Sequence, residues 1–176
     1  MTNYIVKEVP LTEQDKLLCF LENHWKRGHS LVVSPELLRF QHYNKHTNTL
    51  NFIAAENTST LEYDAIIGYI STNQYDPCLL KNGDYWGAIW KIRDDISNNE
   101  LNAVGFFIWK KLFKLPYFQS YAAIGISETA KQIYTVSRLS LGYLNHYFIL
   151  NNQKTDFKIA ANVSSEDKKK HTEQNI

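Results

Sequence analysis

The sequence predicts one α/β domain, built as a mixed central sheet with flanking helices. Of its 176 residues, 44% are hydrophobic and only 21% are charged, which is typical of a globular chain that buries one sizeable core. Helical and strand-like hydrophobic periods follow one another along the chain. In its middle, a strand–helix–strand order predicts a parallel pair of strands joined by a right-handed crossover.

Two helices are expected before the first strand. Thr12 is a candidate cap for the first, in which apolar residues recur at helical spacing as far as about His24. Ser34, followed by Pro35 and Glu36, combines a capping hydroxyl, a pre-set φ and a carboxylate that matches the helix dipole. A second, short helix is therefore expected from this point.

The middle of the chain changes to short apolar runs. Leu50–Ala55 and Ala65–Ser71 are separated by a polar stretch and predict a hairpin. The aromatic and branched run Tyr85–Ile92 predicts a third strand. A loop from Arg93 to Leu101 then leads into a helix expected over Asn102–Lys114.

Three more elements are expected to complete the domain. They are a strand over Tyr121–Ile126, a helix over Glu128–Ser137 capped by Ser127, and a closing strand over Tyr143–Leu150. Residues 151–176 contain too little apolar surface to offset the entropy of ordering them, so they are expected to be a polar tail or linker. The predicted domain therefore spans residues 1–150.

Charge and composition exclude several classes of protein. The formal net charge is +1 with mixed signs throughout, which argues against a nucleic-acid partner. The N-terminus lacks the features of a secretory signal, and no apolar run reaches membrane-spanning length, so a cytoplasmic protein without a membrane span is expected. The two cysteines lack metal-ligand spacing, and no metal site is predicted.

The strongest candidate for a binding site lies at the start of the helix predicted over Asn102–Lys114. Its expected first turn, Asn102-Ala103-Val104-Gly105, combines unpaired backbone amides with small side chains, and the helix dipole there favours an anion such as phosphate. The alternative is an ordinary helix start in which the small residues serve packing.

Two segments resemble the GNAT superfamily of acyl-CoA N-acyltransferases. Glu100-Leu101-Asn102-Ala103-Val104-Gly105 is similar to the pyrophosphate loop Gln/Arg-x-x-Gly-x-Gly/Ala, with Glu100 and Ala103 as departures from it. The segment Ser127–Tyr134 resembles the family's Asn-x-x-Ala-x-x-Leu-Tyr helix. The resemblance implies a splayed parallel strand pair in the middle of the sheet and acyl-CoA, such as acetyl-CoA, as the cofactor.

The resemblance also implies roles for individual residues. Tyr134 takes the place of the family's tyrosine, whose hydroxyl protonates the departing thiolate, and the alternative is a core tyrosine that anchors its helix. The residues implied in cofactor binding lie at the end of the third strand, along the start of the helix and at the next helix cap: Ile92, Asn102, Ala103, Val104, Gly105, Phe106 and Ser127.

Acceptor binding and proton removal need further groups. Glu56, at a strand end, is the first candidate for the base, and Asp94 and Asp95 are carboxylate alternatives. His24 and His29 flank the place where the family forms its acceptor-binding lip. The plain alternatives are solvated turn acids and exposed loop histidines.

The function implied is transfer of an acyl group from acyl-CoA to a small-molecule amine. An amino sugar carried on a nucleotide is the preferred acceptor, because Trp90–Asp95 and Leu144–Tyr147 resemble GNAT-like proteins of bacterial surface-polysaccharide (lipopolysaccharide) biosynthesis. The rival is a non-catalytic GNAT-like binding module of a larger polysaccharide-biosynthesis protein. A homodimer and a downstream domain both stay open as partners.

Overall fold

The computed structural model describes residues 3–95 and 99–144. The chain divides into two compact units, one ending at Ile126 and one beginning at Ser127, and each is described by itself. The predicted domain boundary at residue 150 lies outside the described residues and stays a prediction.

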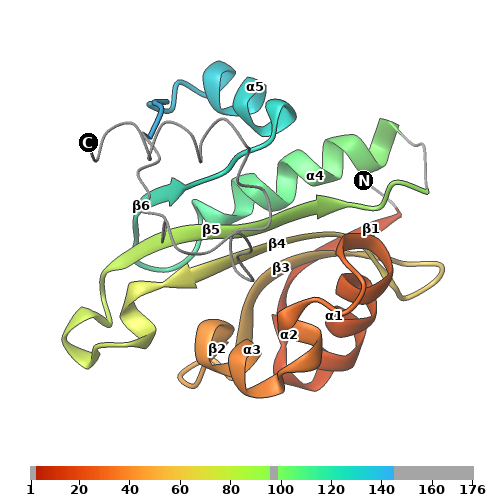
Figure 1. Ribbon diagram of the computed structural model, residues 1–176, viewed down its shortest axis with the longest axis horizontal. Coiled ribbons are helices and arrows are strands. Elements are labelled where there is room, and N and C mark those ends of the chain that lie inside the picture. The colour runs from red at the N-terminus through yellow and green to blue at the C-terminus, as the bar shows by residue number, and fades with distance from the viewer. Residues whose placement is uncertain (1–2, 96–98, 145–176) are drawn as a thin grey trace, which may run out of the picture. The chain divides into compact units, whose positions relative to one another are not determined.

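A six-stranded mixed sheet forms the first unit, which confirms the predicted fold class (Figure 1). Its strands lie in the order β1-β3-β4-β5-β6, and the short β2 pairs with the start of β3. Every pairing is antiparallel except that of β5 with β6. The bounds of the six strands are β1 Tyr4–Pro10, β2 Tyr43–Asn44, β3 Thr49–Asn57, β4 Tyr63–Ser71, β5 Gly83–Ile92 and β6 Phe118–Ala123.

The predicted hairpin is β3 and β4, and the predicted third strand is β5, so both expectations are confirmed. The parallel pair at β5 and β6 is confirmed as well, although β6 begins three residues before the predicted Tyr121. Strand β1 was not predicted. It is an edge strand whose only recorded neighbour among the described strands is β3, and its polar residues Lys7 and Glu8 weaken the apolar pattern.

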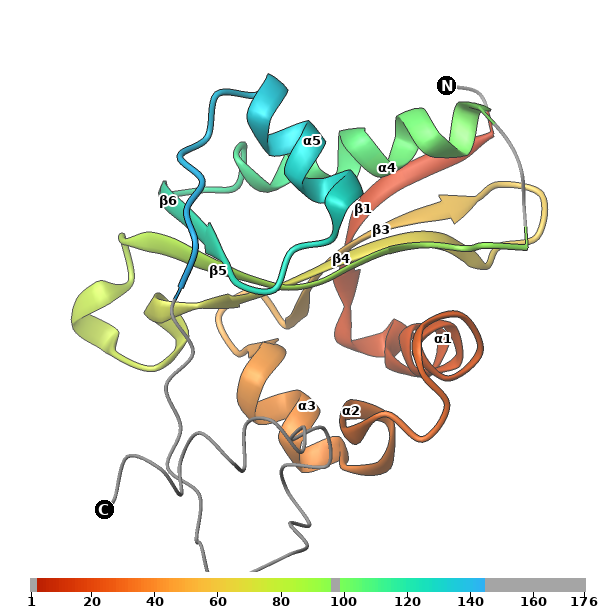
Figure 2. The ribbon, with the colours of Figure 1, turned by 45° about the horizontal axis from the view of Figure 1, so that its top comes forward.

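One face of the sheet is covered by the helices that precede β2 (Figure 2). They are the 3₁₀ turn η1 (Leu11–Glu13), α1 (Gln14–Phe20), the π-helical turn η2 (Leu21–Trp25), α2 (Ser30–Val33) and α3 (Pro35–His42). Two further 3₁₀ turns, η3 (Thr72–Gln74) and η4 (Pro77–Leu79), link β4 to β5.

The two predicted helix caps before the sheet have opposite outcomes. Ser34 accepts a hydrogen bond from the Leu37 amide at 3.2 Å, so the predicted start of α3 is confirmed. The predicted cap at Thr12 is wrong, because this residue lies inside the 3₁₀ turn η1, and neither η1 nor α1 has a side-chain cap. The helical segment itself continues to Trp25, close to the expected end at His24.

Helix α4 (Asn99–Leu112) covers the opposite face of the sheet (Figures 1 and 2). Leu101, Val104, Ile108 and Leu112 of α4 are fully buried. The core on the other face joins the α1–α3 helices to strand residues such as Phe52 and Ile89. The sheet is thus enclosed by a helical layer on each side, which leaves its strand ends and edges for a site.

The second unit contains α5 (Glu128–Val136), as predicted. Ser127 caps it by accepting a hydrogen bond from the Ala130 amide at 3.2 Å. Of the strand predicted over Tyr143–Leu150, Tyr143 and Leu144 are exposed and belong to no helix or strand, and the rest lies outside the described residues. In the parts of the chain described, no helix has the length and apolarity that a membrane crossing needs.

Candidate active site

The parallel pair β5–β6 separates halfway along β5. Pairing with β4 runs in register from Ile92 to Ile89, opposite Ala65 to Gly68, and then resumes with Tyr69 opposite Gly87. Ala88 is therefore an extra residue, a β-bulge, which bends the strand and increases its twist. The pairing with β6 ends at the same point, where Gly87 lies opposite Ala123.

Beyond this point, none of the described strands pairs with the β6-facing edge of Ala88–Ile92. Backbone N–H and C=O groups of an unpaired strand edge need partners, so this edge is suited to an extended ligand with amide groups. A methyl group at Gly87 would lie 2.4 Å from the Tyr121 hydroxyl, so the absence of a side chain there brings this hydroxyl to the point of separation. The splayed pair expected from the family resemblance is thus present.

Helix α4 begins earlier than predicted. Its first residue is Asn99, not Asn102, so Asn102 to Gly105 span the end of the first turn and the start of the second. The amides of Ala103 to Phe106 consequently donate within the helix. The amides that precede the first intrahelical hydrogen bonds of a helix are the ones suited to an anion, and in α4 they belong to the turn that begins at Asn99.

Gly105 sets the distance between α4 and β5. A methyl group at this position would lie 2.2 Å from Cδ1 of Ile92. The Trp90 indole Nε1 donates to the Gly105 carbonyl oxygen at 3.2 Å. Val104 and Gly105 are buried and serve packing, whereas Asn102 and Ala103 are exposed beside the helix start. The small residues of the motif therefore fall into a packing pair and a surface pair.

Glu100, the acidic departure from the motif, accepts a hydrogen bond from Asn3 Nδ2 at 2.8 Å. Asn3 immediately precedes β1, which lies at the far edge of the sheet from β6. The carboxylate is thus directed toward β1, and its negative charge matches the positive end of the helix dipole.

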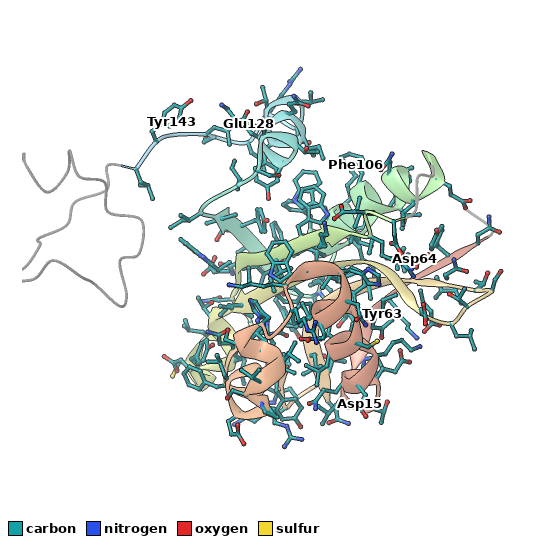
Figure 3. All side chains as sticks on the ribbon, turned by 45° about the vertical axis from the view of Figure 1, so that its right-hand side comes forward. Asp15, Tyr63, Asp64, Phe106, Glu128 and Tyr143 are labelled. Carbon is teal, nitrogen blue, oxygen red and sulfur yellow. The ribbon has the colours of Figure 1, made fainter. Side chains whose placement is uncertain are left out.

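Glu56 is unsuited to the predicted role of general base. Its carboxylate lies 2.9 Å from Lys7 Nζ and 2.5 Å from Lys16 Nζ. Burial alone would raise the pKa of Glu56, but hydrogen bonds from Lys16 and Lys7 outweigh it and leave the pKa lowered. The same cluster includes Glu13, which accepts a 2.6 Å hydrogen bond from the Tyr63 hydroxyl against α1 (Figure 3). These contacts assign Glu56 to an ion cluster between β3, β1 and α1.

The end of β5 carries a second charged network. The Arg93 guanidinium donates to both carboxylate oxygens of Asp95, at 2.9 and 2.7 Å, and to the fully buried Asp64 at 3.1 Å. Asp64, also drawn in Figure 3, is the residue of β4 that follows Tyr63. Asp94 lies outside this pairing and is bound by Lys91 at 2.5 Å. Both carboxylate alternatives for the base are therefore paired with cations.

The two histidines of the predicted acceptor lip have different surroundings. His24 lies in the π-helical turn η2, with Nδ1 3.9 Å from Oδ1 of Asp95. His29 caps α2, where its Nδ1 accepts a hydrogen bond from the Leu31 amide at 3.2 Å. Burial and then the neighbouring Lys26 lower the pKa of His29, which favours the neutral ring that this cap requires. Only His24 is brought to the end of β5.

Ser127 and Tyr134 belong to the second unit, so their predicted contacts with the cofactor stay predictions. Tyr134 is buried on α5, and Ser127 is exposed at its start. The predicted contacts of Ile92, Asn102, Ala103 and Phe106 also stay predictions. Val104 and Gly105 lie within α4, where their amides donate to the preceding turn, and their predicted contacts with the cofactor also stay predictions.

Solved structures resemble this chain, whereas no protein-family model and no curated protein sequence matches it. A ribosomal-protein-alanine N-acetyltransferase from Brucella melitensis biovar Abortus 2308 has a TM-score of 0.51 and 10% identity, covering 85% of this chain and 99% of its own. An aminoglycoside acetyltransferase from an uncultured soil metagenomic sample has a TM-score of 0.56 and 8% identity, covering 85% and 100%. A possible acetyltransferase from Clostridium difficile 630 has a TM-score of 0.52 and 11% identity, covering 85% and 99%. At these identities the comparison establishes the fold.

Proposed function

We propose, from the premise that this chain has the GNAT fold, that it is an acyl-CoA-dependent N-acyltransferase. The observation that carries the proposal is the bulge at Ala88, which coincides with the separation of β5 from β6 on the strand that leads to the start of α4. A backbone edge and a set of helix-start amides then follow each other along the chain. They match the two polar parts of coenzyme A, its amide-containing arm and its pyrophosphate.

In this proposal the edge of Ala88–Ile92 binds the pantetheine arm. The start of α4 binds the pyrophosphate, with Asn102 and Ala103 exposed beside it. Bound acyl-CoA supplies an activated acyl group as a thioester. Tyr134 is retained as the acid that protonates the thiolate, because a phenol with an ordinary pKa of about 10 is near a thiol in acidity.

The acceptor is proposed to be a small-molecule amine. Two of the solved structures with this fold are named for transfer to amines, in an aminoglycoside and in an alanine of a ribosomal protein. An amino sugar, in particular one carried on a nucleotide for surface-polysaccharide synthesis, is our preferred acceptor, on the sequence resemblance of Trp90–Asp95 and Leu144–Tyr147 alone. The identity of the acceptor can be tested independently of the acyl-CoA site.

Calorimetry with acetyl-CoA tests the donor site directly. The wild-type chain is expected to bind acetyl-CoA, and Asn102→Asp is expected to weaken binding about fivefold, since a charge beside a phosphate site costs about 1 kcal/mol. Thr47→Asp is the matched control, because it precedes β3 and therefore lies at the end of the sheet opposite the end of β5. Equal affinity of both variants would place the ligand elsewhere.

Absence of heat at millimolar acetyl-CoA would remove the enzyme assignment and favour the non-catalytic module. If acetyl-CoA binds, release of free thiol is measured with a panel of amines. The panel contains kanamycin, a peptide beginning with alanine and a nucleotide-linked amino sugar. The amine that is acylated fastest identifies the acceptor class, and preference for the nucleotide-linked sugar would support the polysaccharide role.

A further inference from the structure

A layer of aromatic side chains lies between β5 and α4. The indole rings of Trp90 and Trp109 stack at 5.9 Å with an interplanar angle of 14°. Trp109 also packs against Phe106, which is labelled in Figure 3, at 5.7 Å and edge-on against Phe113 at 4.7 Å. Rings in such stacked and edge-to-face arrangements hold one another in place. The side of β5 that faces α4 is therefore closed by rings with little freedom to move.

Tyr121 extends this layer to the point where β5 and β6 separate. Its Cα lies opposite Tyr85 in the parallel pair, but its phenol reaches Gly87, two residues further along β5. A side chain at Gly87 would collide with that phenol, so the ring lies directly against the backbone next to the bulge at Ala88. Phe113 of α4 packs edge-on against Tyr121 at 5.6 Å. Tyr121 therefore places an aromatic ring at the point of separation.

The opposite face of β5 is open at the same point. Tyr85 faces α4, because its ring packs on Phe118, which in turn packs on Phe113. Successive side chains of a strand point to opposite faces, so Trp86 points away from α4. Trp86 is 44% exposed. At the point of separation, β5 thus has a closed aromatic face toward α4 and a face with an exposed indole on its other side.

These two faces offer different surroundings to a bound thioester. In the function proposed above, the pyrophosphate lies at the start of α4 and the pantetheine arm along Ala88–Ile92, so the thioester end of the arm lies toward Ala88. A hydrated amine reaches the carbonyl carbon most easily from the open face, beside Trp86. The apolar end of the acyl group is then directed at the aromatic face, where Tyr121 lies.

We propose that Tyr121 limits the acyl group to acetyl and so determines which acyl-CoA the chain accepts. This role rests on the function proposed above and deepens it. The phenol occupies the space that the further methylene groups of a longer acyl chain would need, and Phe113 and Trp109 support it from behind. Inserting extra methylene groups into a packed apolar site forces side chains out of their preferred rotamers. Tyr121 acts here by occupying space, and no proton transfer is assigned to it.

The alternative is that Tyr121 only packs the core, and Phe118 separates the two roles. Phe118 lies on the same strand and packs against the same Phe113 ring, at 5.0 Å. Its Cα lies opposite Gly83, at the end of β5 where the two strands are still paired. Removal of the Phe118 ring therefore loosens the aromatic layer without opening space at the point of separation.

Calorimetry with coenzyme A, acetyl-CoA and butanoyl-CoA tests the wild-type chain without an acceptor. The wild type is expected to bind acetyl-CoA at least about tenfold more tightly than butanoyl-CoA, since one methylene group in an apolar site is worth about 10–200-fold. Equal affinity for acetyl-CoA and butanoyl-CoA would overturn the role of Tyr121 and leave the proposed function standing. If none of the three binds, the proposed function itself is overturned, and the role of Tyr121 with it.

Three variants then assign the preference to Tyr121. Tyr121→Ala is expected to bind acetyl-CoA and butanoyl-CoA within about threefold of each other, because the ring no longer excludes the longer chain. Its affinity for coenzyme A, which has no acyl group, should stay within about twofold of the wild type. Tyr121→Phe, whose ring fills the same space, and the control Phe118→Ala should both keep the preference for acetyl-CoA. An unchanged preference in Tyr121→Ala, or an equal shift in Phe118→Ala, would refute the role of Tyr121.

Discussion

Replacing Arg93 tests whether the ion network holds the end of β5 in place. Arg93→Met keeps most of the aliphatic stem but removes the charge, and so leaves the Asp64 carboxylate buried with hydrogen bonds from Asn57 and Tyr4. The Asp64 side chain is 0% exposed and that of Arg93 is 15% exposed. Removing one partner of a buried pair costs about 3–5 kcal/mol, and the hydrogen bonds that remain place the expected loss near the lower end, about 3 kcal/mol.

Urea unfolding of three variants measures this loss. Arg27→Met is the matched control, because its side chain is 95% exposed and lies 3.8 Å from Glu22, so about 0.5 kcal/mol or less is expected. In Arg93→Met combined with Asp64→Asn, no buried charge is left unpaired, and more than half of the lost stability should return. If Arg93→Met costs no more than Arg27→Met, or if the double variant recovers nothing, the network does not stabilise this end of the sheet.

For three further changes, the surroundings of a single residue give the direction of the expected effect on stability or affinity. Burial lowers the pKa of His42 to about 4, so folding disfavours its proton, and the stability present above pH 6.5 is lost as pH falls toward 4. Urea titrations should show a loss of about 2 kcal/mol between pH 7 and pH 5 that is absent in His42→Asn. Gly83→Ala places a methyl group 2.5 Å from the Tyr117 carbonyl oxygen, and thermal unfolding should show a loss of about 1–3 kcal/mol, whereas Gly142→Ala, with nothing within 4 Å, should change little. Ala103→Gly should leave the acetyl-CoA affinity within twofold and cost about 1 kcal/mol of helix stability by urea unfolding; a clear gain in affinity would return the phosphate to residue 103.

Much of the fold was predictable because local signals agreed with it. Ser34 and Ser127 are caps in the structure because a serine hydroxyl reaches the amide three residues on. The polar stretch between β3 and β4 is likewise a local signal, because it marks the turn between the two apolar runs that pair as a hairpin. The bulge at Ala88 carries no such signal, because it is a mismatch of register between two strands and exists only once they pair.

The candidate site was only partly predictable, for a related reason. Glu56 was chosen because it ends a strand, but its two lysines come from β1 and α1, which are 49 and 40 residues away in the chain. His24 and Asp95 were separate candidates for different roles, and no spacing rule joins residues so far apart in sequence. Their approach depends on the π-helical turn and on the Arg93 fork, which are consequences of packing.

The two departures from the glycine motif, Glu100 and Ala103, therefore argue less strongly against a phosphate at this helix start than the sequence alone indicated. Glycine is required where φ is positive or where another group comes close, and no described residue of α4 has a positive φ. The close approach in α4 is at Gly105, where the motif does keep its glycine. Ala103 lies in regular helix, and Glu100 is bound to Asn3. An anion at this helix start would be held by backbone amides, which any sequence supplies, so neither departure from the motif removes the groups that such an anion needs.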